Sequence, residues 1–154
     1  MGKQGVTKLT VNESAGDFTH VLVLDAADIV AAGNTATEFA TIPAGGALDV
    51  AVAYAATDIT GGSSVTLSVG TTSGTPDEFI KDADIDAANA LVANTGDSLE
   101  AGSAAATKIK GGSLPVGLAT SDTKVYYKFG GTVSSITAGK IIIGLRIFDL
   151  GRFA

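Results

Sequence analysis

Alternating aspartates at Asp82, Asp84 and Asp86 are the residues whose types and spacing most resemble a metal site. They match the opening of a calcium-binding loop, in which carboxylates at every second position face the ion. The match ends at two demanding positions. Ala87 stands where the loop needs glycine for its sharp turn, and Ala93 stands where it needs a bidentate glutamate. We therefore expect no specific metal and no other cofactor, and we keep the three aspartates only as candidate ligands of an incidental cation.

Nucleophilic and zinc chemistry lack their usual residues in this chain. His20 is the single histidine and there is no cysteine, so serine–histidine, cysteine–histidine and common zinc arrangements lose a partner. Sixteen acidic residues offer many carboxylate pairs of the kind a glycosidase uses, but the absence of tryptophan argues against a sugar-processing cleft. The glycine pairs at 61–62, 111–112 and 130–131 are not followed by the Lys-Ser/Thr of a phosphate loop. We expect no enzyme and no catalytic residue.

The composition also argues against two classes of binding partner. No apolar run approaches the length that spans a membrane, and the ten basic residues are not interleaved with aromatics as in nucleic-acid-binding proteins. The first five residues lack the apolar stretch of a signal peptide, which favours synthesis in a cytoplasm. We expect neither a membrane nor a nucleic acid as partner.

Strand-like runs separated by turn-rich segments dominate the chain. Twenty glycines and many threonines and serines favour strands over long helices. Strands are predicted at residues 19–25, 35–42, 47–55, 64–69, 124–129 and 140–148, with a less regular run at 7–11. This spacing is typical of an antiparallel β-sandwich or barrel. The predicted organisation is an N-terminal arm or first strand over residues 1–18 and one β-sandwich domain over residues 19–154.

Helical signals are few. Thr75, Pro76 and Glu78 have the spacing of a capping box with proline at the first helical position, which predicts about two turns ending near Asp82. Residues 86–92 could add a second short turn, and residues 94–106 are predicted to form a long surface loop. The expected fold is therefore all-β with one or two short helical turns.

Two strands are apolar on both faces. In the run 47–55, Leu48, Val50, Val52 and Tyr54 alternate with small alanines, and in the last strand both sets of alternate positions are apolar apart from Arg146. The last strand is therefore either central in its sheet, or its second face meets another subunit.

Charge is distributed unevenly along the chain. Residues 1–104 carry three basic and fourteen acidic side chains, whereas residues 105–154 carry seven basic and two acidic ones. Two oppositely charged parts could orient the protein against a partner. The alternative is that strands of the two parts interleave, so that the charges average out.

Several short motifs resemble a module of tailed-phage structural proteins. They are residues 40–45 (ATIPAG) leading into 50–52 (VAV), 65–71 (VTLSVGT), 75–80 (TPDEFI), 82–86 (DADID), 125–129 (VYYKF) and 137–140 (TAGK) before the final strand. The similarity covers roughly residues 36–149. It is closest to capsid decoration, or cement, proteins of bacteriophages. The resemblance implies a jelly-roll-like β-sandwich on the capsid surface of the virion, with the major capsid protein as partner and with a homotrimeric assembly.

Two other functions remain open at this stage. A phage tail or fibre component would share the same motifs and the same structural role. A carbohydrate-binding β-sandwich would need an aromatic platform, for which Tyr54, Tyr126, Tyr127 and the phenylalanines are the available residues. Both alternatives, like decoration of a head shell, require no catalysis.

Overall fold

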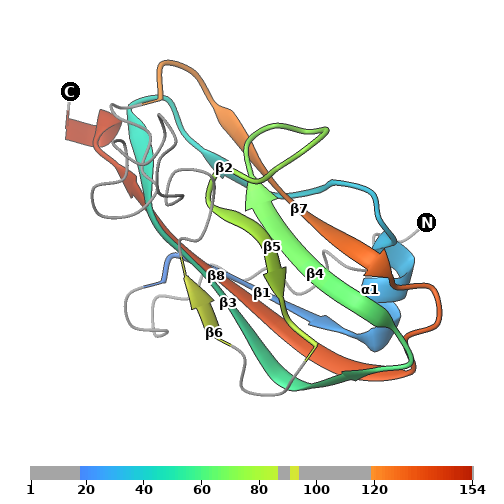
Figure 1. Cartoon of the computed structure of the whole chain (residues 1–154). Coiled ribbons are helices and arrows are strands. Elements are labelled where there is room, and N and C mark those ends of the chain that lie inside the picture. The colour runs from blue at the N-terminus through green and yellow to red at the C-terminus, as the bar shows by residue number, and fades with distance from the viewer. Residues whose placement is uncertain (1–17, 87–90, 94–118, 154) are drawn as a thin grey trace, which may run out of the picture.

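The computed structural model describes residues 18–86, 91–93 and 119–153, which form two antiparallel sheets packed face to face (Figure 1). Sheet A has the order β1-β8-β3-β6, with strands His20–Asp25, Ala138–Asp149, Gly46–Thr60 and Leu91–Ala93. Sheet B has the order β2-β7-β4-β5, with strands Thr37–Ile42, Thr123–Thr132, Ser63–Gly70 and Ile80–Asp84. The prediction of an all-β antiparallel sandwich is confirmed.

The strands pair in a nested pattern. β4 pairs with β5, β3 with β6, β2 with β7 and β1 with β8, so the chain forms one long antiparallel ribbon folded at the β4–β5 connection. The ribbon is wound so that β3 also pairs with β8, and β4 with β7. These pairings complete the two four-stranded sheets. An eight-stranded, two-sheet arrangement of this kind is a jelly roll. The strand order therefore agrees with the jelly-roll expectation.

The winding also determines how charge is distributed. β7 and β8 belong to the basic C-terminal part of the chain, and each lies between two strands from the acidic part. The two parts interleave in both sheets, so among the described strands they do not form separate acidic and basic ends. The uneven charge along the sequence therefore gives no reason to expect that these residues orient the protein against a partner.

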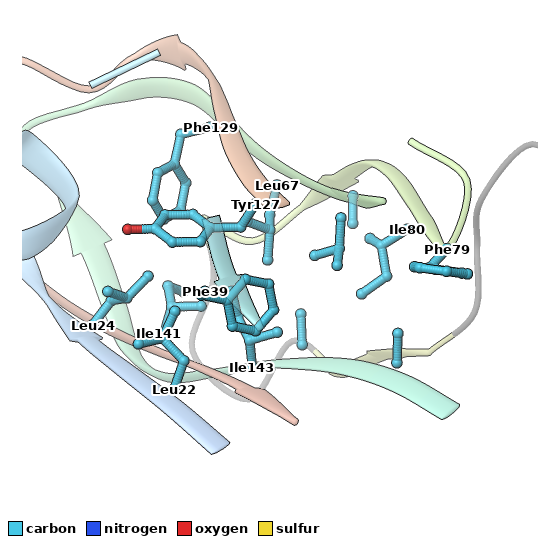
Figure 2. Close-up of a cluster of buried hydrophobic side chains, with 14 of the residues drawn as sticks. Leu22, Leu24, Phe39, Leu67, Phe79, Ile80, Tyr127, Phe129, Ile141 and Ile143 are labelled. Carbon is cyan, nitrogen blue, oxygen red and sulfur yellow. The ribbon is translucent and has the colours of Figure 1, made fainter. Parts of the chain in front are cut away.

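Large side chains from both sheets fill the space between them. Figure 2 shows Leu22, Leu24, Ile141 and Ile143 of sheet A facing Leu67, Tyr127 and Phe129 of sheet B. The ring of Tyr127 makes edge-to-face contacts with Phe39 and Phe129, at centroid distances of 5.6 and 5.7 Å. Such pairs contribute about 0.5–1.5 kcal/mol beyond the area they bury. The core is thus more aromatic than a chain with nine Phe and Tyr residues in total suggests.

An irregularity in β3 decides which of its side chains reach the core. The pairing with β8 shifts between Leu48 and Val50, as at a β-bulge, so alternation restarts there. Leu48, Ala51, Ala53 and Ala55 are fully buried, whereas Val50, Val52 and Tyr54 are half-buried and point to the outer side of sheet A. The small alanines leave room for the large core side chains of sheet B. Leu48 and Tyr54, which simple alternation places on one face, lie on opposite faces.

One α-helix, α1 at Ala26–Ala32, connects β1 to β2 and was not predicted from the sequence. Asp25 is its N-cap: the Asp25 carboxylate accepts from the Asp28 N–H at 3.0 Å, and the Asp28 carboxylate accepts from the Asp25 N–H at 3.2 Å. This reciprocal capping box starts the helix, and Gly33, at φ 58°, ends it. Within the described residues, no helix is long and apolar enough to cross a membrane.

The helix predicted after Thr75 is wrong. Residues 71–79 form a loop, and Ile80 already begins β5. Instead of capping a helix, the Glu78 carboxylate accepts hydrogen bonds from the backbone N–H groups of Thr71, at 2.7 Å, and Thr72, at 3.4 Å, and from both threonine hydroxyls. A Cβ at Gly70 would overlap the Glu78 carboxylate, so glycine is needed there. Glu78 therefore stabilises the turn at residues 69–71, the Val-Gly-Thr turn, with which β4 ends.

The remaining predictions from the sequence fall partly outside the described residues. The run at 7–11, residues 87–90 of the second helical turn and the loop at 94–106 lie outside them. Of the turn predicted for 86–92, the described residues at its end belong to strand β6, so a helix there is wrong for these positions.

Candidate functional site

The aspartates considered as metal ligands lie in and just after the edge strand β5: Asp82 and Asp84 are within it, and Asp86 is two residues beyond its end. The Asp82 carboxylate accepts from the Ser68 hydroxyl at 3.2 Å, and the Asp86 carboxylate accepts from the Val65 N–H at 3.0 Å. Asp84 accepts from the backbone N–H of Asp86 at 3.1 Å. In the part of the chain that the structure describes, no cluster of three or more His, Asp or Glu side chains could hold a metal ion. Two of these carboxylates thus tie β5 to β4, and the third supports the turn that follows.

His20 is engaged with the backbone of β8 through its neighbour. The His20 Nδ1 lies 3.0 Å from the Thr19 hydroxyl, which in turn donates to the Leu145 carbonyl at 3.2 Å and accepts from the Ile147 N–H at 2.9 Å. Partial burial of the ring lowers the pKa of His20 below its ordinary 6.5 because the charged form loses hydration. This arrangement stabilises the junction of β1 and β8, and the Thr19 hydroxyl is already engaged by the backbone of β8.

A half-open depression with a mixed polar and apolar lining lies on the outer side of sheet B. It has a volume of about 130 Å³, and Lys128 reaches across its rim to donate to the Gly74 carbonyl at 3.0 Å. Small-molecule sites usually measure about 300–1,000 Å³. The depression is therefore large enough for a few waters or one partner side chain. It is lined by Ser68, Thr75, Pro76, Asp77, Asp82, Lys128, Phe129 and Gly130.

The three tyrosines do not form a platform for sugar rings. Tyr54 lies on the outer side of sheet A, Tyr126 lies on the outer side of sheet B, and Tyr127 is fully buried between the sheets. A carbohydrate-binding face needs aromatic side chains gathered on one surface. The tyrosines therefore provide no such platform, and the exposed Phe148 and Phe153 are the other aromatic candidates.

Apolar surface is concentrated at the C-terminal end of the chain. Phe148, Leu150 and Phe153 are 45%, 51% and 87% exposed, and the only other exposed large apolar side chain among the described residues is Val30 of α1, at 36%. Phe148 is near the end of β8, and Phe153 closes a 3-10 turn at Gly151–Phe153. Sequence reasoning treated the last strand as important but did not single out these three residues. The sequence does contain a signal for them, because large apolar residues continue past Asp149, where the strand ends.

This C-terminal end is held in place by backbone hydrogen bonds. The Leu150 N–H donates to the Gly45 carbonyl at 3.2 Å, and the Phe153 N–H donates to the Leu150 carbonyl at 3.0 Å. The Gly45 N–H in turn donates to the Ala119 carbonyl at 2.8 Å. An exposed aromatic ring on an ordered turn loses little conformational freedom on binding. We call Phe148, Leu150 and Phe153 the C-terminal patch.

α1 and the C-terminal patch lie at opposite ends of the sandwich (Figure 1). The register shows this directly: Asp25, just before α1, pairs with Lys140 at the start of β8, whereas the patch follows the far end of the same strand. The candidate functional surface is thus one end of the jelly roll, together with the outer face of sheet A that leads to it.

Comparisons of this chain with protein-family models, with curated proteins and with solved structures each find no significant match.

Proposed function

We propose that this chain is a virion structural protein that decorates and stabilises a bacteriophage head shell. In this role it is made in the host cytoplasm, assembles on the capsid surface, binds the major capsid protein and associates with itself as a homotrimer. The trimer and the identity of the partner rest on the resemblance described above. The protein acts by binding and requires no catalytic step.

The observation that carries the proposal is the combination of a jelly-roll strand order with an ordered, exposed apolar end. Jelly rolls are widely used in viral capsid proteins and in lectins. An apolar anchor on a fixed turn suits attachment to another protein. The loop after the Val-Gly-Thr turn is held by Glu78, so the motif that resembles those of phage structural proteins has a defined structural role in this chain.

In this proposal the C-terminal patch contacts the shell. Aromatic anchors carry a large share of binding energy when they enter a pocket on the partner. Phe153 is 87% exposed, so it contributes little to the folded state and is available for such a contact. A polar substitution there is expected to weaken shell binding without weakening the fold.

Co-sedimentation with head shells that lack the protein tests the proposal. The wild type is expected to pellet with shells, and Phe153→Asp is expected to remain in the supernatant with an unchanged melting temperature. Val30→Asp, an exposed apolar position at the opposite end of the sandwich, is the matched control and should pellet like the wild type. Wild-type protein that does not bind shells would refute the proposed decoration. Binding to purified tails instead would support the tail or fibre role.

A further inference from the structure

The outer face of sheet A is apolar across adjacent strands. Val23, Ile142 and Tyr54 pair in one row across β1, β8 and β3. The next row on the same face joins Val21, Gly144 and Val52. All the side chains of these rows are half-buried, apart from Gly144, which has none.

Gly144 sits at the middle of this face for a steric reason. A Cβ built on Gly144 would lie 2.9–3.2 Å from the ring atoms of Phe18, so the ring lies directly over the glycine. A side chain at this position would displace the ring. Phe18 therefore adds an aromatic group to the outer face of sheet A, and Gly144 provides the flat place on which it packs.

Sheet B gives an internal comparison, because its outer face is polar. Tyr126 there pairs with Glu38, Lys128 pairs with Ser68, and Thr66 pairs with both Gly130 and Asp84. A half-solvated antiparallel sheet normally alternates apolar inward and polar outward residues. Sheet B follows this rule and sheet A does not. The difference lies within one molecule, so it is not explained by composition.

The outer face of sheet A also has the layout of a protein interface. β8 has twelve residues and β1 has six; at a rise of about 3.4 Å and with neighbouring strands about 4.8 Å apart, these strands and the part of β3 beside them give a footprint on the order of 500 Å². A standard interface buries about 800 Å² per partner, so this face would supply the apolar centre of such a contact. Charged side chains lie toward the ends: Asp25 pairs with Lys140 at one end, and Arg146 pairs with Val50 toward the other. An apolar centre between charged margins is the usual anatomy of such a contact.

We propose that the outer face of sheet A is the surface through which this chain associates with a second copy of itself. This inference rests on the proposed function, because it assigns the self-association of the decoration protein to one face and leaves Leu150 and Phe153, which lie beyond the end of β8, for the shell. Tyr54 and Arg146 belong to the residue types that most often anchor protein interfaces. Around the Phe18 ring the face is ribbed by its strands, so a second apolar face can interdigitate with it.

Substitutions on the two sheets test the inference on the full-length chain. Val52→Lys and Val23→Lys each place a charge on the outer face of sheet A, and Tyr126→Lys places the same charge on the outer face of sheet B, beside Glu38. Molar mass by light scattering and sedimentation, with circular dichroism and melting temperature for each variant, is the measurement. The isosteric Val52→Thr is included in case the lysine variants do not fold.

The expected result is a wild type with a mass that is a multiple of 15.2 kDa, and a Tyr126→Lys variant with the same mass. Val52→Lys and Val23→Lys should be folded and run as single chains, and Val52→Thr should raise the dissociation constant at least about tenfold. A Val52→Lys variant that assembles like the wild type would overturn the inference. So would a Tyr126→Lys variant that dissociates equally, or an unchanged dissociation constant in Val52→Thr when the lysine variants are unfolded.

Three further outcomes, each with a monomeric wild type, also overturn the inference. A monomeric wild type that Val52→Lys destabilises places the cover of this face within the same chain. A monomeric wild type that loses shell binding on the same substitution makes this face the shell contact. A monomeric wild type with neither effect leaves the face without an occupant. Oligomers that do not bind shells would instead support the inference and refute the proposed decoration.

Discussion

Replacing Ile143 with alanine tests the assignment of β8 as the central strand of sheet A. Ile143 is fully buried and pairs with Leu22 of β1 on one side and with Ala53 of β3 on the other. The change removes three carbons, which at about 0.8 kcal/mol for each buried CH₂ amounts to roughly 2.4 kcal/mol. Because neighbouring Ala53 is too small to fill the space, a residual cavity on the order of 60 Å³ would add about 1.5 kcal/mol. The expected loss of unfolding free energy is about 3–4 kcal/mol.

Ile142→Ala is the matched control. Ile142 is the preceding residue of the same strand and undergoes the same chemical change, but its side chain points outward and is half-buried. We expect it to lose about 1 kcal/mol of unfolding free energy, since less apolar area leaves contact.

Urea unfolding of both variants, followed by circular dichroism at one fixed protein concentration, measures the difference. The concentration must be low enough that every variant is a single chain, because association with a second copy adds to apparent stability and Ile142 lies on the face proposed for that association. Equal losses for the two variants, or a loss below about 0.5 kcal/mol for Ile143→Ala, would contradict the assignment of these faces.

Three other predictions concern polar groups. The Tyr127 hydroxyl is buried without a hydrogen-bond partner among the described residues, and burial raises its pKa. Tyr127→Phe should therefore leave the melting temperature unchanged or raise it, because no hydrogen bond is lost. A marked drop in melting temperature would show that the hydroxyl does make a stabilising hydrogen bond. Folding lowers the pKa of His20, so its contribution to stability is complete above the unfolded value of 6.5 and is lost as pH falls from there to the folded value. The melting temperature of His20→Asn should therefore fall less between pH 8 and pH 5 than that of the wild type, and identical pH profiles would contradict this. Calcium should not raise the melting temperature, and a rise that Asp84→Ala abolishes would restore the metal site.

The strands were predictable because they depend on a local pattern. Val65, Leu67 and Val69 alternate with small polar residues, and the structure buries all three in β4. The final strand was identified as central or as facing another subunit, and it lies between β1 and β3. Both predictions depend on alternation with a period of two, because successive side chains of a strand point to opposite faces of the sheet and each face has one environment.

The helices show where local signals fail. Two capping boxes occur in the sequence, and the one at Asp25 starts a helix because alanines and Ile29 follow it and Ile29 reaches the core. The other, at Thr75, does not, because Glu78 bonds to the preceding turn and Phe79 and Ile80 enter the core in extended conformation. Tertiary contacts decide between two similar local patterns, and the sequence alone does not contain them.

The candidate surface was predictable only in part. The doubly apolar last strand indicated an additional contact, and it is the strand that carries Ile142 and Phe148 on its outer side. The irregularity in β3 that turns Val50, Val52 and Tyr54 outward has no clear sequence signal, because it depends on the pairing with β8. The exposure of Phe153 likewise depends on hydrogen bonds that hold the end of the chain against residues 43–46.

The thermal rupture of head shells, measured with and without a saturating amount of this protein, tests the central claim most directly. A protein that cements a shell binds the intact form better than the ruptured form, so it must shift the equilibrium or the barrier toward the intact shell. The account predicts that shells lacking the protein rupture at a higher temperature once wild-type protein is added, and that Phe153→Asp gives a smaller increase or none. An unchanged rupture temperature at saturating wild-type protein would contradict it.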